Sequence, residues 1–212
     1  MTAFATMPIT EETLKELFKE SDFIQIPATE ADFWQLIELS QYRIEYHNQQ
    51  IVGTMSYAAT NHERIVSNAI YLFRSLLEEE DFEVFGSNRP IYAAECGNVY
   101  EPDVHVIEGV LDEYHYNKTK TASSNPALLV EVFSPSTKNF DLGLKLDCYK
   151  TIPTLKHIIY VEPDKVHVQV FNRTKRPNEW QNVDYFDLEQ KIRVFGKSIS
   201  LKNIYKKVIF KD

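Results

Sequence analysis

Residues 126–163, PALLVEVFSPSTKNFDLGLKLDCYKTIPTLKHIIYVEP, contain two apolar segments separated by a polar loop and a helical pattern. The first segment is typical of a fully buried strand except that it contains Glu131, and the second, residues 156–162, predicts another strand. Between them, residues 140–151 predict a helix that ends before Pro153. This order of elements predicts an α/β (α+β) fold with a mixed β-sheet flanked by helices.

Glu131 requires a partner, because a carboxylate taken out of water without compensation costs on the order of several kcal/mol. Lys145 on the predicted helix could supply it as a purely structural ion pair. A second carboxylate, Asp103, follows Pro102 at the start of a predicted strand over residues 103–107. If the strands that carry Asp103 and Glu131 are neighbours, the two carboxylates converge at one end of the sheet and the helix brings Lys145 over them.

The remaining segments complete one predicted domain over residues 1–212, with its core at about 61–171. Thr10 and Thr29 each precede an amphipathic helical pattern, and Asp32 completes a capping-box pattern with Thr29, so we expect a helical lead-in and, after the core, a small antiparallel extension. The predicted elements are helices at 11–20 and 30–39, a hairpin at 42–48 and 49–57, a long helix at 62–80, strands at 82–86, 90–95, 165–171, 180–186 and 191–195, and a last segment at 199–208.

Composition excludes several classes of protein. The chain of 212 residues is 43% hydrophobic and 25% charged, which is typical of a globular protein, and its net charge of -8 argues against nucleic-acid binding through bulk positive charge. No apolar run reaches the ~18 residues that span a bilayer and the start does not match a signal peptide, so we expect a cytoplasmic protein with no membrane partner. Cys96 and Cys148 are then expected to be buried thiols rather than a disulfide.

Converging carboxylates at Asp103 and Glu131 would form an oxygen-rich site of the kind that binds Mg²⁺ or Mn²⁺. Such an ion polarises a phosphoryl oxygen and activates a water, and the ammonium of Lys145 could orient that water or offset negative charge on the phosphate. Tyr149 lies one helical turn after Lys145 on the same face and is a further candidate. The pattern therefore predicts phosphodiester hydrolysis.

The order of these elements resembles the PD-(D/E)XK nuclease superfamily, and the finer pattern resembles the Uma-two family of restriction-endonuclease-like proteins. The resemblance covers roughly residues 30–206 and is carried by RIEYHNQQIVGTMS at 43–56, NHERIVSN at 61–68, EPDVHVIEG at 101–109, the stretch at 126–163, VHVQVF at 166–171 and SISLKNIY at 198–205.

This resemblance implies that Asp103 and Glu131 are metal ligands and that Lys145 is the catalytic lysine. In much of the superfamily the lysine lies two positions after the glutamate, where this chain has Phe133, whereas the Uma-two pattern moves it to the following helix. A long side chain can deliver its ammonium to the same point from either element. Lys138 in the intervening loop is a weaker substitute.

Two earlier residues match the family pattern. Glu45 could add a carboxylate and His62 could contact phosphate or water; alternatively, Glu45 is an edge-strand residue and His62 caps the long helix. The family usually has a glycine in the turn after this glutamate, and this chain does not, so Asn48 is expected to supply the positive φ of a tight hairpin.

These inferences favour a Mg²⁺- or Mn²⁺-dependent DNA endonuclease. A nuclease that cuts both strands of a duplex usually needs two sites, which favours a homodimer. Two alternatives remain: a catalytically inactive nuclease-fold protein that serves as a nucleic-acid or protein binding module, and a hydrolase of another substrate that uses two carboxylates without a metal.

Overall fold

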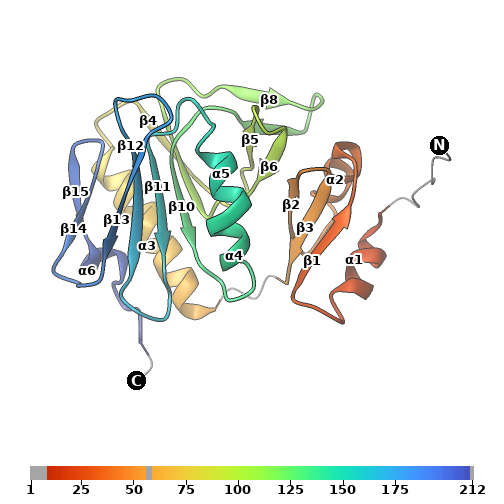
Figure 1. Ribbon diagram of the computed structural model, residues 1–212, viewed down its shortest axis with the longest axis horizontal. Helices are drawn as coiled ribbons and strands as arrows, with labels where there is room; N and C mark the ends of the chain where they lie inside the picture. The colour runs from red at the N-terminus through yellow and green to blue at the C-terminus, as the bar shows by residue number, and fades with distance from the viewer. Residues whose placement is uncertain (1–8, 56–58, 211–212) are drawn as a thin grey trace.

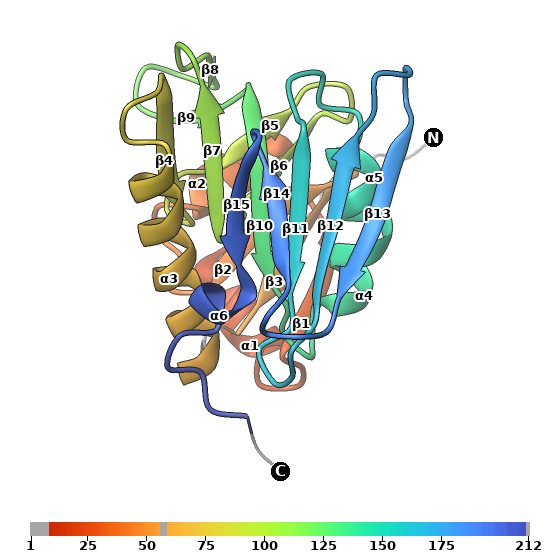
Figure 2. The ribbon, with the colours of Figure 1, turned by 90° about the vertical axis from the view of Figure 1, so that its left-hand side faces the viewer.

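The computed structural model describes residues 9–55 and 59–210, which form two large β-sheets with helices packed against them (Figures 1 and 2). The predicted mixed sheet is present. Its six strands follow the order β13-β12-β11-β10-β7-β4, with bounds β4 Phe82–Gly86, β7 Val104–Glu108, β10 Pro126–Val132, β11 His157–Val161, β12 Val168–Arg173 and β13 Trp180–Tyr185.

Strand β10 lies at the centre of this sheet, parallel to β11 and antiparallel to β7. A parallel pair needs a crossover connection, and here the chain crosses through α4 (Lys138–Phe140), a wide π-type turn η1 (Asp141–Lys145) and α5 (Leu146–Tyr149). The expected helix at 140–151 is therefore not continuous, because Gly143 adopts non-helical angles of φ -101° and ψ -113°. The predicted adjacency of the strands that follow Asp103 and contain Glu131 is confirmed.

The two faces of β10 pack against different layers. Leu128 and Val130 belong to a core cluster that also contains Ile65 of α3 (Thr60–Leu76). The same cluster includes residues of the hairpin β14 (Lys191–Val194) and β15 (Lys197–Ser200) and of α6 (Leu201–Ile204). Leu129 packs in a second cluster with Tyr149 of α5. Figure 2 shows α3, β14, β15 and α6 on one side of the six-stranded sheet and α4 and α5 on the other. Since side chains alternate along a strand, Glu131 points toward α5, as Leu129 does.

The second sheet has seven strands and was not predicted as a separate layer. It contains the expected hairpin and short strands, and Figure 1 shows α4 and α5 between the six-stranded sheet and β1 to β3. Its order is β1-β3-β2-β6-β5-β9-β8, with bounds β1 Phe23–Pro27, β2 Arg43–His47, β3 Gln50–Thr54, β5 Ile91–Ala93, β6 Asn98–Tyr100, β8 Glu113–His115 and β9 Thr121–Ser123.

The N-terminal segment is more than the helical lead-in expected. Both helices, α1 (Glu11–Leu17) and α2 (Glu30–Leu36), are present, and Thr10 and Thr29 each form the capping box that fixes the start of a helix. Between them, however, β1 pairs along its whole length with β3. The lead-in is therefore built into the seven-stranded sheet.

The hairpin of β2 and β3 turns where predicted. Asn48 has φ 49°, which confirms its expected role, and Gln49 has φ 60°. Positive φ at both central residues gives the twist that suits a two-residue hairpin. The backbone N–H of Asn48 also donates to Asn98 Oδ1 at 2.9 Å, which ties the turn to β6. Residues 56 and 57, at the end of the expected second strand, lie outside the described residues.

The expectation of free thiols is wrong, because Cys96 and Cys148 form a disulfide with a Cα–Cα distance of 6.1 Å. Cys96 follows β5, and Cys148 lies on α5, so two segments that are unrelated in sequence meet where the seven-stranded sheet packs on the crossover helix. The bridge thus links the helix after Lys145 to the second sheet.

Reduction of this disulfide is expected to lower the free energy of unfolding by about 2–4 kcal/mol, because the 52-residue separation makes a long loop in the unfolded chain. Urea unfolding with and without a phosphine reductant measures the change. Without reductant, thiol titration of the urea-unfolded protein should find no free thiol; two titratable thiols would show that the bridge does not form.

Across residues 9–55 and 59–210, no helix has the length and apolar character needed to cross a bilayer.

Candidate active site

Asp103 and Glu131 lie at the same edge of the six-stranded sheet. Asp103 immediately precedes β7, and the register pairs Val104 with Val130 of β10, so the two carboxylates are carried at the paired ends of neighbouring strands. Asp103 Oδ2 accepts the backbone N–H of Val132 at 2.7 Å. Both side chains are almost fully buried, at 2% and 3% exposure.

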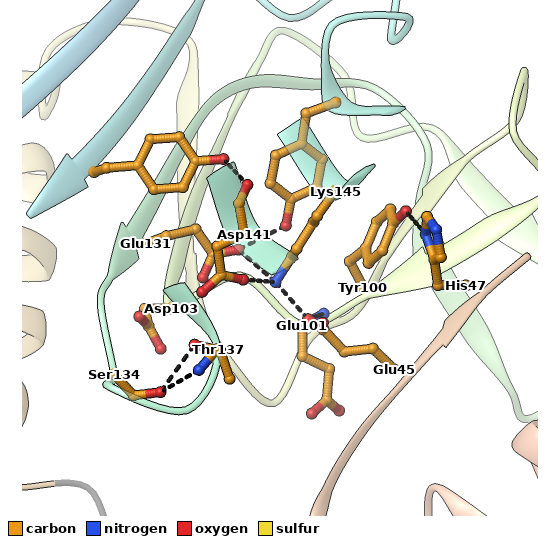
Figure 3. A network of polar contacts seen from close by, with 12 residues as sticks. Glu45, His47, Tyr100, Glu101, Asp103, Glu131, Ser134, Thr137, Asp141 and Lys145 are labelled. Atoms are coloured by element: carbon orange, nitrogen blue, oxygen red, sulfur yellow. Dashed lines mark hydrogen bonds and ion pairs between the residues drawn. The ribbon is translucent and has the colours of Figure 1, made fainter. Parts of the chain in front are cut away.

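Lys145 is the centre of a buried ion cluster (Figure 3). Its Nζ lies 2.9 Å from Glu131 Oε1, 2.7 Å from Glu45 Oε1 and 3.4 Å from Asp141 Oδ1. The hydroxyl of Tyr149 donates to Glu131 Oε1 at 2.6 Å. The structural ion pair considered for Glu131 therefore exists, and it is part of a larger arrangement that includes β2, β10 and the crossover helix.

The wide turn η1 helps to form this cluster. Asp141 and Lys145 are its first and last residues, and both side chains are buried on the same side as Glu131. The carbonyl of Asp141 also accepts the hydroxyl of Tyr160 at 2.9 Å, which anchors the turn to β11.

Arg43 of β2 contacts both predicted metal ligands. Its Nη1 lies 2.9 Å from Asp103 Oδ1, its Nη2 lies 3.8 Å from Glu131 Oε2, and Nη2 also donates to the carbonyl of Glu101. The Arg43 side chain retains 25% exposure, compared with 3% and 4% for the two carboxylate side chains. The arginine therefore covers the pair of acids from the side of the second sheet.

The pKa values of the two carboxylates are shifted in opposite directions. Burial raises the pKa of Asp103, but Arg43 and His62 outweigh burial and hold that pKa well below its usual range. Burial raises the pKa of Glu131 to about 7, although Lys145 opposes the rise. Glu131 is thus a carboxylate whose negative charge is only partly compensated, so it would gain from an additional cation.

Lys145 is a permanent cation. Burial acts to lower its pKa, but Glu131, Glu45 and Asp141 outweigh burial and raise the pKa well above its usual value. Its Nζ also lies 5.5 Å from the centre of the Tyr100 ring, within the range of a cation–π contact. A protonated Lys145 can stabilise negative charge or orient a water, but it cannot accept a proton.

The structure also places the further predicted residues. Glu45 is not on an edge strand, because β2 lies between β3 and β6; its Oε1 accepts both Lys145 and the backbone N–H of Glu101 at 2.9 Å. His62 is not a helix cap, because α3 has Ala59 at its N-cap; His62 Nε2 lies 3.4 Å from Asp103 Oδ2. Lys138 pairs with Glu162, and no ion pair joins it to the carboxylates around Lys145 among the described residues.

Two residues of the cluster were missed in the sequence. Arg43 lies two positions before Glu45, and alternation along a strand puts both side chains on one face. Asp141 lies four positions before Lys145, a spacing that brings side chains together on a helix. Both signals were present, but each becomes informative only after Glu45 and Lys145 are known to be buried together.

A cavity of about 660 Å³ opens beside the cluster. Its wall includes Arg43, Glu45, Glu131 and Lys145, together with the Ser134-Pro135-Ser136-Thr137 loop, which directly follows β10. Asp103 is not one of the described residues that line the cavity. It lies against Arg43, which does line it. His62 also lines the cavity and contacts Asp103, so a ligand in the cavity would meet Glu131 and Lys145 directly and Asp103 past Arg43 and His62.

Asp103 and Glu131 could bind Mg²⁺ or Mn²⁺ only if waters or substrate phosphates supply the other ligands. Within the described parts of the chain, no group of three or more His, Cys, Asp or Glu side chains is arranged to hold a metal. Mg²⁺ is commonly held by one or two carboxylates, with waters and substrate phosphates at the other positions, and Asp103 and Glu131 supply such a pair. The partly compensated charge of Glu131 beside a cavity favours that fit.

A family model described as "Putative restriction endonuclease" (Uma2) matches residues 30–201. The chain belongs to this family. The match includes Arg43, Asp103, Glu131 and Lys145, and it agrees with the resemblance seen in the sequence.

The individual proteins that are similar to the chain are distant in sequence. Two uncharacterised proteins of Synechocystis sp. are similar to the chain: one is 28% identical over 134 residues, 63% of this chain and 74% of its own, and the other is 27% identical over 180 residues, 84% and 92%. A crystal structure of a "putative nuclease belonging to DUF820" from Anabaena variabilis superposes with a TM-score of 0.61 at 15% identity, covering 95% of this chain and all of that one. This likeness shows that the two chains share a fold, which agrees with the match to a restriction-endonuclease family.

Proposed function

We propose that the chain is a divalent-metal-dependent DNA endonuclease, with Asp103 and Glu131 as the metal-binding carboxylates and Lys145 as the catalytic cation. The observation that carries the proposal is the contact of the Lys145 ammonium with Glu131 at the wall of a cavity, with Asp103 at the same sheet edge. Membership of a restriction-endonuclease family and a nuclease-type fold support the reaction class.

A bound divalent ion would polarise a phosphoryl oxygen and lower the pKa of the attacking water. The chain's own residues do the rest. Lys145 stays protonated and presents its ammonium to charge that develops on the phosphate, where a fixed charge in a water-poor site is most effective. Tyr149 donates to Glu131 Oε1 and so fixes the orientation of that carboxylate, which makes Tyr149 a positioning residue.

Glu45 positions the lysine. Its Oε1 is held by the backbone N–H of Glu101, and that same atom accepts a hydrogen bond from Lys145 Nζ. The lysine is thereby held between β2 and β10, within reach of the cavity. Cleavage of both strands of a duplex would need a second copy of this site, which a homodimer would provide.

The test is nicking of supercoiled plasmid. Wild-type protein is expected to convert the plasmid to open circles with Mn²⁺ or Mg²⁺ and not with a chelator. Asp103→Asn should lose most of this activity, because the amide oxygen is a weaker metal ligand than a carboxylate. Asp187→Asn, at an exposed turn, is the control and should remain active.

A second candidate, a nuclease-fold binding module without cleavage, is favoured by one observation: Arg43 contacts both carboxylates that would hold the metal. Absence of nicking with both metals, on duplex and single-stranded DNA, would support this module and contradict the enzyme. Cleavage that persists in chelator would contradict the metal requirement.

A further inference from the structure

Each of the two carboxylates has one oxygen fixed by the protein frame. Glu131 Oε1 is engaged by Lys145 at 2.9 Å and by the hydroxyl of Tyr149 at 2.6 Å. Asp103 Oδ2 is engaged by the backbone N–H of Val132 at 2.7 Å, with His62 at 3.4 Å. These contacts fix the orientation of both carboxylates and leave Asp103 Oδ1 and Glu131 Oε2 for other partners.

The second oxygens both face Arg43. Asp103 Oδ1 lies 2.9 Å from Nη1 and Glu131 Oε2 lies 3.8 Å from Nη2, so the guanidinium spans the two oxygens. A divalent ion bound by this pair of acids would use these same oxygens, because the other two already accept hydrogen bonds. A planar guanidinium is well suited to bridge two oxygens in this way.

Arg43 also separates Asp103 from the cavity. Arg43 and Glu131 line the cavity wall, whereas Asp103 is not among the described lining residues and lies against the guanidinium. The arginine extends from β2 of the seven-stranded sheet, while both acids are carried by the six-stranded sheet. His62 also lines the cavity and contacts Asp103 Oδ2, so an ion that enters from the cavity reaches Asp103 past Arg43 and His62, and Arg43 is the group on Oδ1.

We propose that Arg43 and the divalent ion are alternative occupants of the same pair of oxygens, Asp103 Oδ1 and Glu131 Oε2, so that metal binding displaces the guanidinium. The inference rests on the proposed metal site. In the metal-free protein, Arg43 compensates part of the charge of the two acids. Metal binding must displace Arg43. The apparent affinity for the metal is therefore the intrinsic affinity multiplied by the fraction of molecules in which Arg43 has left the two oxygens.

Removal of the competing cation should therefore tighten metal binding. For Arg43→Gln, the dissociation constant for Mn²⁺, measured from the EPR signal of free Mn²⁺ without DNA, is expected to fall about tenfold or more relative to wild type. The control is Arg176→Gln, because Arg176 is 82% exposed and pairs only with nearby Glu179 among the described residues; it should bind Mn²⁺ as wild type does. Equal or weaker Mn²⁺ binding by Arg43→Gln would overturn the inference.

A second measurement uses wild-type protein and so does not depend on the folding of the variant. Mg²⁺ is titrated while the ¹⁵N signal of the Arg43 Nε group is followed, with Arg43→Lys used to assign the signal. The signal should shift and saturate in parallel with Mg²⁺ binding. Mg²⁺ binding that leaves the Arg43 signal unchanged would contradict displacement.

The outcomes separate the two proposals. If wild type binds Mn²⁺ and Arg43→Gln binds it no more tightly, the competition is excluded and the nuclease proposal stands. If neither protein binds Mn²⁺ or Mg²⁺, both the competition and the metal-dependent mechanism are excluded.

Discussion

Replacement of Lys145 by methionine is expected to lower the free energy of unfolding at pH 7.5 by about 3–5 kcal/mol. The side chain is 2% exposed, and it is the cation that Glu45, Glu131 and Asp141 share. Methionine has a similar length and fills the space, so the loss comes from the charge. Removing one partner of a buried ion cluster leaves uncompensated carboxylates, which is far more costly than losing a surface ion pair.

The loss should depend on pH in a definite direction. Burial raises the pKa values of Glu131 and Asp141, and Lys145 opposes the rise in both. Without Lys145, these two pKa values should rise further in the folded protein, which then binds more protons than the unfolded chain. Stability of the variant therefore falls as pH rises through the acidic to neutral range, and the difference from wild type should be smaller at pH 5 than at pH 7.5. Urea unfolding at both pH values measures this.

A matched control is Lys202→Met. Lys202 pairs with Glu189 at 2.9 Å, but both side chains are well exposed, so the small effect of a surface pair is expected at both pH values. If Lys145→Met were as stable as this control, Lys145 would not be the counter-ion of the cluster. Plasmid cleavage by Lys145→Met should fall by about 10²–10³-fold, as for other fixed groups that stabilise developing charge.

Local signals in the sequence predict much of the fold. The continuous apolar run over residues 127–133 predicts a fully buried strand, and Thr10 and Thr29 mark helix starts that the structure contains as capping boxes. Three of the missed strands, β6, β8 and β9, have three residues each, which is too short for an alternating pattern to be distinctive. The five-residue strand β1 was also missed. Of the short strands, β6 and β9 each pair with a strand that is distant in sequence. The seven-stranded sheet that they help to form could therefore not be predicted from local patterns.

The disulfide and the break at Gly143 were not predictable for related reasons. The bridge between Cys96 and Cys148 depends on how the second sheet packs on α5, which spacing in the sequence does not reveal. Gly143 lies in a helical pattern, and a single glycine is tolerated in a helix, so the pattern gives no reason to expect the wide turn there.

The part of the candidate site around Glu131 was predictable, because a carboxylate is unusual in an otherwise apolar strand. Glu131 in an apolar strand required a cation, and the nearest following helix offered Lys145, which the structure places 2.9 Å away. Arg43 could not be found in the same way, because it is a partly exposed strand residue whose importance depends on the packing of one sheet against the other. The catalytic role of Lys145 and the metal-binding roles of Asp103 and Glu131 stay predictions.

Glu131→Gln is expected to have the opposite effect on stability from Lys145→Met. The pKa of Glu131 is raised by burial to about 7 from an ordinary value near 4.5, so the folded protein binds more protons than the unfolded chain between these pH values. The contribution of Glu131 to stability is therefore present below about pH 4.5 and is lost as pH rises to about 7, a change of roughly 3 kcal/mol.

Glutamine cannot ionise, and its amide oxygen can still accept the hydroxyl of Tyr149, so Glu131→Gln should avoid this loss. In chelator at pH 8, its free energy of unfolding is expected to exceed that of wild type by about 1–3 kcal/mol, with a flatter dependence on pH between 5 and 7. The same variant should lose Mn²⁺ binding and plasmid cleavage. Glu189→Gln, at a side chain that is 74% exposed, should match wild type in all three measurements.

A gain in stability together with a loss of metal binding would mean that the buried charge of Glu131 is maintained for function, since the fold would be more stable without it. If Glu131→Gln were instead less stable than wild type at pH 8 and kept the same pH dependence, the ion pair with Lys145 would outweigh the cost of burying the carboxylate. Glu131 would then be a structural residue, and the uncompensated charge on which the metal-binding argument depends would not exist.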